Sequence, residues 1–83
     1  MNKIKIDRIK KVREARGMTQ GEFAEALGVH RSLVSRWENG KKIPQLDTLI
    51  RISDVLNCSF LVFVDNQIAI EAMIRYNHSY PFV

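Results

Sequence analysis

Apolar residues recur three or four positions apart along the first two thirds of the chain, which is the spacing of one face of a helix. In the segment DRIKKVREARG, the apolar positions Ile9, Val12 and Ala15 predict a first helix. Asp7 is its expected N-cap, and Gly17 is the expected left-handed residue after its end.

The second helix is predicted to begin at Thr19, where Glu22 three residues later completes a capping box. Its inward positions are Phe23, Ala24 and Leu27. Gly28 follows within otherwise helical spacing, although glycine inside a helix costs roughly 0.8–1.0 kcal/mol relative to alanine. Because glycine enters the left-handed region without steric cost, Gly28 is predicted to be a turn between two helices.

A third helix is expected from about Arg31 to Asn39, with Val34 and Trp37 pointing inward and Gly40 ending it. Pro44 forbids a continuous helix across the loop that follows. The segment LDTLIRISDVLN predicts a fourth helix with Asn57 at its C-cap. Its apolar positions are Leu46, Leu49, Ile50 and Leu56.

The remainder of the chain leaves two alternatives open. The aromatic and β-branched run SFLVFV favours a strand, and the alternation of Ile68 and Ile70 after a turn at residues 65–66 favours a hairpin. A helix over residues 66–76 is the competing prediction, since Ala72 and Met73 are good helix formers.

Length and composition predict one small protein that binds no membrane and works in the cytoplasm. The 83 residues contain no apolar run near the roughly 20 residues that cross a bilayer. The single cysteine, Cys58, can form no internal disulfide and has no metal-ligand partner at useful spacing. We therefore expect no cofactor and no metal, with Cys58 as a small buried apolar residue.

The net charge of +4 hides an asymmetry between the two parts of the chain. Up to Lys42, eleven Lys and Arg face five Asp and Glu, a balance of +6, whereas the rest carries −2. A basic half beside a mildly acidic one indicates a region that binds a polyanion.

Two amphipathic helices joined at Gly28 form the helix-turn-helix arrangement, whose second helix lies in the DNA major groove. The run MTQGEFAEALGVHRSLVSRWENGKKIPQLDTLIRISDVLN closely resembles the XRE family of regulators, which includes phage Cro proteins and phage repressors. The resemblance covers roughly residues 6–59. It implies a mainly α, lambda-repressor-like fold of four to five helices. We expect a DNA-binding domain over residues 1–59 and a C-terminal extension over residues 60–83.

With Val34 and Trp37 buried, the third helix points its other face outward toward DNA. Two exposed arginines suit guanine, whose O6 and N7 accept a bidentate guanidinium. The resemblance places base contacts on Arg31, Ser32 and Arg36. Leu33 either touches a thymine methyl group or covers the margin of the helix.

Phosphate contacts position such a protein without reading sequence. The predicted phosphate contacts are Gln20, His30, Ser35, Asn39, Lys41 and Lys42. By resemblance, Gln20 and Asn39 hold the DNA backbone, while His30 occupies the N-cap position of the third helix. Arg13 and Glu38 match a pair that bridges the first and third helices in relatives, so both are assigned to structure.

These observations predict a sequence-specific repressor that binds a two-fold operator in double-stranded DNA as a homodimer. The apolar segment predicted to hold the dimer, by strand pairing or by a helical interface, is Phe60, Leu61, Val62, Phe63 and Val64. The alternative is a HipB-like antitoxin that autoregulates its operon and binds a toxin protein. It is favoured because SFLVFV resembles the strand that follows the fourth helix and pairs across the dimer in such antitoxins. An enzyme is disfavoured, because His30 and His78 have no partnered nucleophile in the sequence. A scaffold that binds only proteins leaves Arg31 and Arg36 unexplained.

Overall fold

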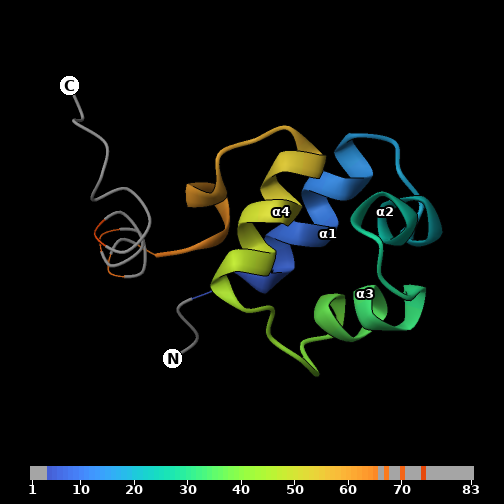
Figure 1. Ribbon diagram of the computed structural model, residues 1–83, viewed down its shortest axis with the longest axis horizontal. Helices are drawn as coiled ribbons and strands as arrows, with labels where there is room; N and C mark the ends of the chain where they lie inside the picture. Colours follow the sequence, from blue (N-terminus) through green and yellow to red (C-terminus); the bar gives the residue numbers. More distant parts are fainter. Residues whose placement is uncertain (1–3, 66, 68–69, 71–73, 75–83) are drawn as a thin grey trace.

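Four α-helices pack around one apolar core in the computed structural model, which describes residues 4–65, 67, 70 and 74 (Figure 1). The elements are α1 (Ile6–Ala15), α2 (Gln20–Leu27), α3 (Arg31–Glu38), α4 (Leu46–Leu56) and the short 3-10 helix η1 (Phe60–Phe63). No helix among the described residues is long and apolar enough to cross a membrane.

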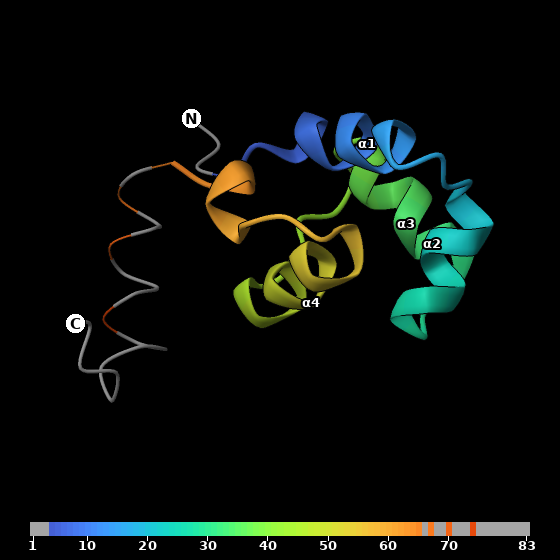
Figure 2. The same ribbon diagram turned by 90° about the horizontal axis from the view of Figure 1, so that it is seen from above.

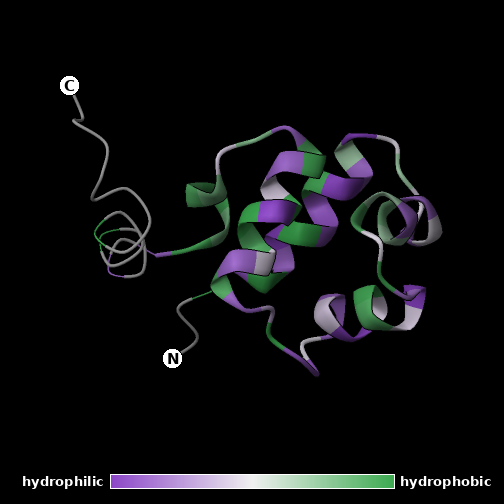
Figure 3. Cartoon of the chain, in the orientation of Figure 1, coloured by the Kyte–Doolittle hydropathy of each residue, from purple (hydrophilic) through white to green (hydrophobic). Residues whose placement is uncertain are grey.

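The core collects the apolar positions of all these elements. In Figure 3 the helices alternate between apolar and polar positions, as expected for helices with one buried face. The largest fully buried side chains are Trp37, Phe23, Phe63, Ile9, Leu49, Ile52, Leu56 and Val34. Burying a side chain of this size stabilises the fold by about 1.5–3 kcal/mol relative to leaving it exposed. The predicted mainly helical fold is therefore confirmed, and it rests on one continuous core.

The predicted start and end signals of the two central helices are confirmed. Thr19 accepts from the Glu22 backbone at 3.0 Å, and the Glu22 carboxylate accepts from the Thr19 backbone at 2.9 Å, which is a complete capping box. Gly28 has φ 74° and Gly40 has φ 72°, both in the left-handed region. The turn at Gly28 therefore sets the angle between α2 and α3.

Three smaller predictions about the outer helices are wrong. Lys5, not Asp7, occupies the N-cap of α1, and Asp7 lies in the first turn, where its charge suits the positive helix end. Ala15 is exposed at the end of α1. In α4, Ile52 is fully buried while Ile50 is only partly buried. The buried face of α4 is therefore rotated about the helix axis relative to the predicted one, and it is formed by Leu49, Ile52, Ser53 and Leu56.

The prediction of a strand at residues 60–64 is also wrong, because Phe60–Phe63 form η1 and only Val64 is extended. Figures 1 and 2 show this short helix beside α4, with the beginning of α1 close by. Phe63 and Val64 are adjacent and both buried, whereas successive residues of a strand point to opposite faces. Ile4 and Val64 form one antiparallel bridge, and the Lys5 amide donates to the Phe63 carbonyl at 2.7 Å.

The packed unit therefore extends past the predicted boundary at Ser59. Of the proposed dimer segment, Phe63 and Val64 face the protein's own core, while Leu61 is 47% exposed. The predicted hairpin partner Ile68 lies outside the described residues, as do Ala72 and Met73. Gln67, Ile70 and Ile74 have helical conformation, which agrees with the competing helix prediction.

Candidate nucleic-acid interface

The outward face of α3 is set by the two large residues that it buries. Val34 is fully buried and Trp37 is 2% exposed, so the helix is anchored on one side. Arg31, Ser32 and Arg36 consequently lie on the solvent side, as the spacing predicts.

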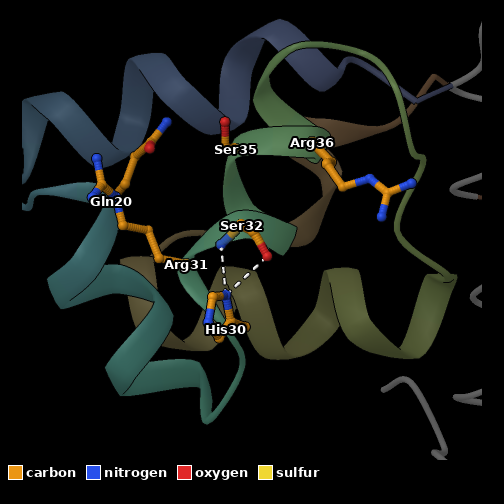
Figure 4. A pocket seen from close by; sticks show the side chains of 6 residues that line it. All are labelled: Gln20, His30, Arg31, Ser32, Ser35 and Arg36. Atoms are coloured by element: carbon orange, nitrogen blue, oxygen red, sulfur yellow. Dashed lines mark hydrogen bonds between the residues drawn. The ribbon is translucent and has the colours of Figure 1, made fainter.

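These exposed side chains surround a shallow depression of about 440 Å³ (Figure 4). It is lined by Gln20, His30, Arg31, Ser32, Ser35 and Arg36. In Figure 4, Arg31 extends toward Gln20 at the start of α2, and Arg36 points away from it. Six of the residues predicted to contact DNA thus lie on one surface. Arg31 and Arg36 supply its two positive charges, on opposite sides of the depression.

Other predicted contact residues lie away from this depression. Leu33 is partly buried against the core and lines a second depression of about 190 Å³, which Lys42 and Ile43 also border. This placement agrees with the alternative in which Leu33 covers the margin of the helix. Asn39 and Lys41 are exposed where α3 ends.

A buried ion pair fixes α3 to α1, which confirms the structural assignment of Arg13 and Glu38. Arg13 donates from Nε and Nη2 to the two carboxylate oxygens of Glu38, at 2.6 and 2.9 Å. The two side chains are 7% and 2% exposed. The hydrogen bond to Glu38 raises the pKa of the Arg13 guanidinium, while desolvation by burial opposes that change.

Gln20 belongs to this ion-pair network as well as to the surface. Its side-chain amide donates to Glu38 Oε1 at 3.0 Å. Arg13 Nη1 also donates to the Met18 carbonyl at 2.7 Å, just before α2 begins. The start of α2 and the end of α3 are therefore locked together. The predicted phosphate contact of Gln20 stays a prediction, now with one amide hydrogen engaged inside the protein.

His30 caps the N-terminus of α3, in the position that the sequence assigns to it. Its Nδ1 accepts from the Ser32 amide at 3.2 Å, and the Ser32 Oγ lies 2.8 Å from the same nitrogen (Figure 4). The statement that His30 has no partnered nucleophile is therefore wrong. His30 Nδ1 already caps the helix, and both side chains are exposed. The Ser32–His30 contact is therefore interpreted as part of the N-cap of α3.

The sequence did not reveal that three further arginines serve the fold. Arg16 donates to the Leu56 and Asn57 carbonyls at 2.7 and 3.1 Å, which satisfies the open end of α4. Arg8 donates to the Val62 carbonyl at 3.0 Å, and Arg51 donates to the Leu27 carbonyl at the end of α2. The acceptors lie 24 to 54 residues away in the chain, so no local signal marks these contacts.

The described residues contain no cluster of three or more His, Cys, Asp or Glu that could hold a metal ion. Cys58 is partly buried against the core, and burial raises the pKa of its thiol. The chemistry of the α3 surface is thus that of cations and hydrogen-bonding groups, which are the groups that bind phosphates and base edges.

The family comparison agrees with this site. The helix-turn-helix family HTH_3 matches residues 9–63, so the chain belongs to that family, which confirms the resemblance to XRE-type regulators.

A prophage-derived regulator of Bacillus subtilis, YonR, is 38% identical over 53 residues, which is 64% of this chain and 49% of YonR. The chain thus spans about half the length of that relative. The regulator SinR, solved in complex with DNA, is 34% identical with a TM-score of 0.62. That match covers 66% of this chain and 89% of the SinR chain.

The fold alone does not define what such a domain does. Hydroxypropylphosphonic acid epoxidase from S. wedmorenis contains a similar domain, with a TM-score of 0.70 and 28% identity. The match covers 78% of this chain and 36% of the epoxidase. A function for this chain must therefore rest on the side chains of α3.

Proposed function

We propose that this chain is a sequence-specific transcriptional repressor that inserts α3 into the major groove of double-stranded DNA. The observation that carries the proposal is the placement of Arg31 and Arg36 on one exposed face beside the depression. Neither guanidinium is used by the rest of the described chain, unlike those of Arg8, Arg13, Arg16 and Arg51. Each can therefore donate in a bidentate manner to a guanine.

The proposed DNA contacts divide by their chemistry. Arg31, Ser32 and Arg36 contact base edges, whereas the remaining groups on this side contact phosphates. The phosphate set is Gln20, His30, Ser35, Asn39, Lys41 and Lys42. A DNA-bound relative, SinR, supports the proposal, as does the +6 balance of the first 42 residues. No catalytic step is proposed for the Ser32–His30 pair.

A homodimer on a two-fold operator is part of the proposal. One recognition helix reads few base pairs, and two helices about 34 Å apart lengthen the site that is read. Leu61, Ile70 and Ile74 are large apolar residues that are 47%, 58% and 67% exposed. Ile70 and Ile74 are both exposed and both have helical conformation, which suits a subunit contact. Occupying the operator would exclude polymerase from the cytoplasmic DNA and so repress transcription.

The antitoxin alternative loses the feature that favoured it. That feature was a strand after the fourth helix, paired across a dimer, and residues 60–63 form η1 instead. A toxin partner is therefore not part of the proposal.

Selection of bound sequences from a random DNA pool tests the proposed function. The expected result is one enriched motif with two-fold symmetry and half-sites about 10 base pairs apart. Enrichment of no motif would contradict sequence-specific binding, and enrichment of a single half-site would contradict the two-fold operator.

A further inference from the structure

The hydroxyl of Ser32 has a fixed hydrogen-bond polarity, set by His30. The Ser32 amide donates to His30 Nδ1 at 3.2 Å, and a backbone N–H has no other role than donor. Nδ1 therefore carries a lone pair and no proton. Since Ser32 Oγ lies 2.8 Å from this same nitrogen, the hydroxyl must donate its only hydrogen to Nδ1.

A hydroxyl whose hydrogen is engaged can only accept from a ligand. In the major groove the only base donors are the amino groups, N6 of adenine and N4 of cytosine. Guanine O6 and N7, thymine O4 and phosphate oxygens are all acceptors, and none of them can pair with a Ser32 hydroxyl in this state.

Ser35, on the next turn of the same surface, has the opposite polarity. The Asn39 side-chain amide donates to Ser35 Oγ at 3.3 Å, so this hydroxyl keeps its own hydrogen. The hydrogen has no acceptor among the described residues. A donor of this kind suits a phosphate oxygen, which agrees with the predicted role of Ser35.

We propose that Ser32 reads the amino group of an adenine or cytosine in the operator, with His30 as the positioning residue that makes Ser32 an obligate acceptor. This inference rests on the proposed DNA-binding function and adds the class of base that each side chain reads. Arg31 and Arg36 supply donors for guanine, and Ser32 supplies an acceptor between them in the chain. Together they give α3 a mixed recognition pattern.

The test uses the full chain and the duplex obtained by selection. Ser32→Ala first identifies the base pair at which discrimination is lost. At that pair, adenine is replaced by unsubstituted purine, or cytosine by 2-pyrimidinone, each of which lacks only the amino group. Wild-type affinity should fall about three- to tenfold, the effect of one hydrogen bond, and the Ser32→Ala protein should show no such fall. Replacing a purine of that pair by its 7-deaza analogue, which lacks the N7 acceptor, should leave wild-type affinity unchanged.

Two His30 variants separate the effect of His30 on the hydrogen-bond direction of the Ser32 hydroxyl from its effect as the N-cap of α3. His30→Asn keeps a side-chain acceptor at the N-cap, and His30→Ala removes it. In His30→Ala the freed Ser32 hydroxyl can donate, so guanine in place of adenine, or thymine in place of cytosine, should be better tolerated. His30→Asn should retain wild-type discrimination. Ser35→Ala is the matched control, and it should weaken binding to all duplexes alike.

Equal wild-type affinity for the parent and amino-free duplexes would overturn the inference, as would unchanged discrimination at every base pair in Ser32→Ala. A 7-deaza duplex that reproduces the loss of Ser32→Ala would overturn it too, because Ser32 would then be a donor. If any of these three results came with specific binding that depends on Arg31 and Arg36, the proposed function would stand without this inference. Failure of the wild-type protein to select any sequence would defeat both.

Discussion

The arginines of α1 and its C-cap differ from those of α3 in what they contact, although both sets contribute to the same basic half of the chain. Arg8, Arg13 and Arg16 donate to a carboxylate or to carbonyl oxygens of the protein itself. Arg31 and Arg36 are exposed beside the depression on α3. Net charge therefore overstates the number of cations that are free to bind DNA. An arginine stabilises the fold when it lies next to the end of a helix or a buried carboxylate. An arginine that lies elsewhere on the surface is free to bind DNA.

The largest effect is expected where an arginine is buried with its partner. Glu38→Ala should reduce the free energy of unfolding by about 3–5 kcal/mol, because Arg13 would be left buried without a counter-charge. Denaturant unfolding followed by tryptophan fluorescence measures this, since Trp37 lies in the core next to the pair in sequence. The double variant Arg13→Met/Glu38→Leu should recover most of the loss. A loss below about 1 kcal/mol in Glu38→Ala would show that the pair contributes little.

The core contribution of η1 gives the second prediction. Phe63→Ala should cost about 3–5 kcal/mol of stability, because Phe63 is fully buried. Ile43→Ala, in the loop after α3 and 42% exposed, is the control outside η1 and should change stability by no more than about 0.5 kcal/mol. Truncation after Ser59 should therefore destabilise the four helices rather than leave them intact. Similar stability for the two single variants would place η1 outside the packed unit.

The recognition surface gives smaller effects of a different kind. Arg31→Ala and Arg36→Ala should each weaken cognate DNA binding by about 1–3 kcal/mol and relax the preference at particular base pairs. Binding to random duplex measures the contribution of phosphate contacts alone. Equal losses on cognate and random DNA would mean that these arginines contact only phosphates.

Lys41 is expected to have the smallest effect, and only on electrostatics. Lys41→Ala should weaken cognate and random DNA binding together, and it should lower the slope of log affinity against log salt by about 0.9. Lys10→Ala on α1 is a control for loss of a surface charge away from α3. An unchanged slope in Lys41→Ala would remove this lysine from the interface.

The sequence predicts the α2–turn–α3 region well because its signals are local. The capping box at Thr19 and the left-handed glycine at Gly28 depend on neighbours within a few residues. The buried positions Val34 and Trp37 follow from helical spacing, and they fix the exposed face of α3.

The segment after α4 could not be predicted in this way. Its conformation depends on distant contacts, such as the bridge between Ile4 and Val64 and the Arg8 contact to the Val62 carbonyl, 54 residues away. Such contacts outweigh the β propensity of the aromatic and branched residues at 60–63, which form η1. The sequence also could not show that the Ser32 hydroxyl donates to His30, because this depends on the His30 ring lying with Nδ1 against Ser32.

The central claim is that the arginines of α1 and its C-cap stabilise the fold while the α3 arginines bind DNA, and one paired measurement tests it. Thermal stability and cognate DNA affinity are measured for Arg16→Ala and Arg36→Ala under the same conditions. Arg16→Ala should lose about 1–2 kcal/mol of stability, because the carbonyls at the end of α4 lose a charged donor, and the folded protein should retain its DNA affinity. Arg36→Ala should lose about 1–3 kcal/mol of cognate affinity with its stability unchanged. Retained cognate affinity in Arg36→Ala, or an affinity loss in folded Arg16→Ala as large as that of Arg36→Ala, would contradict the division of roles.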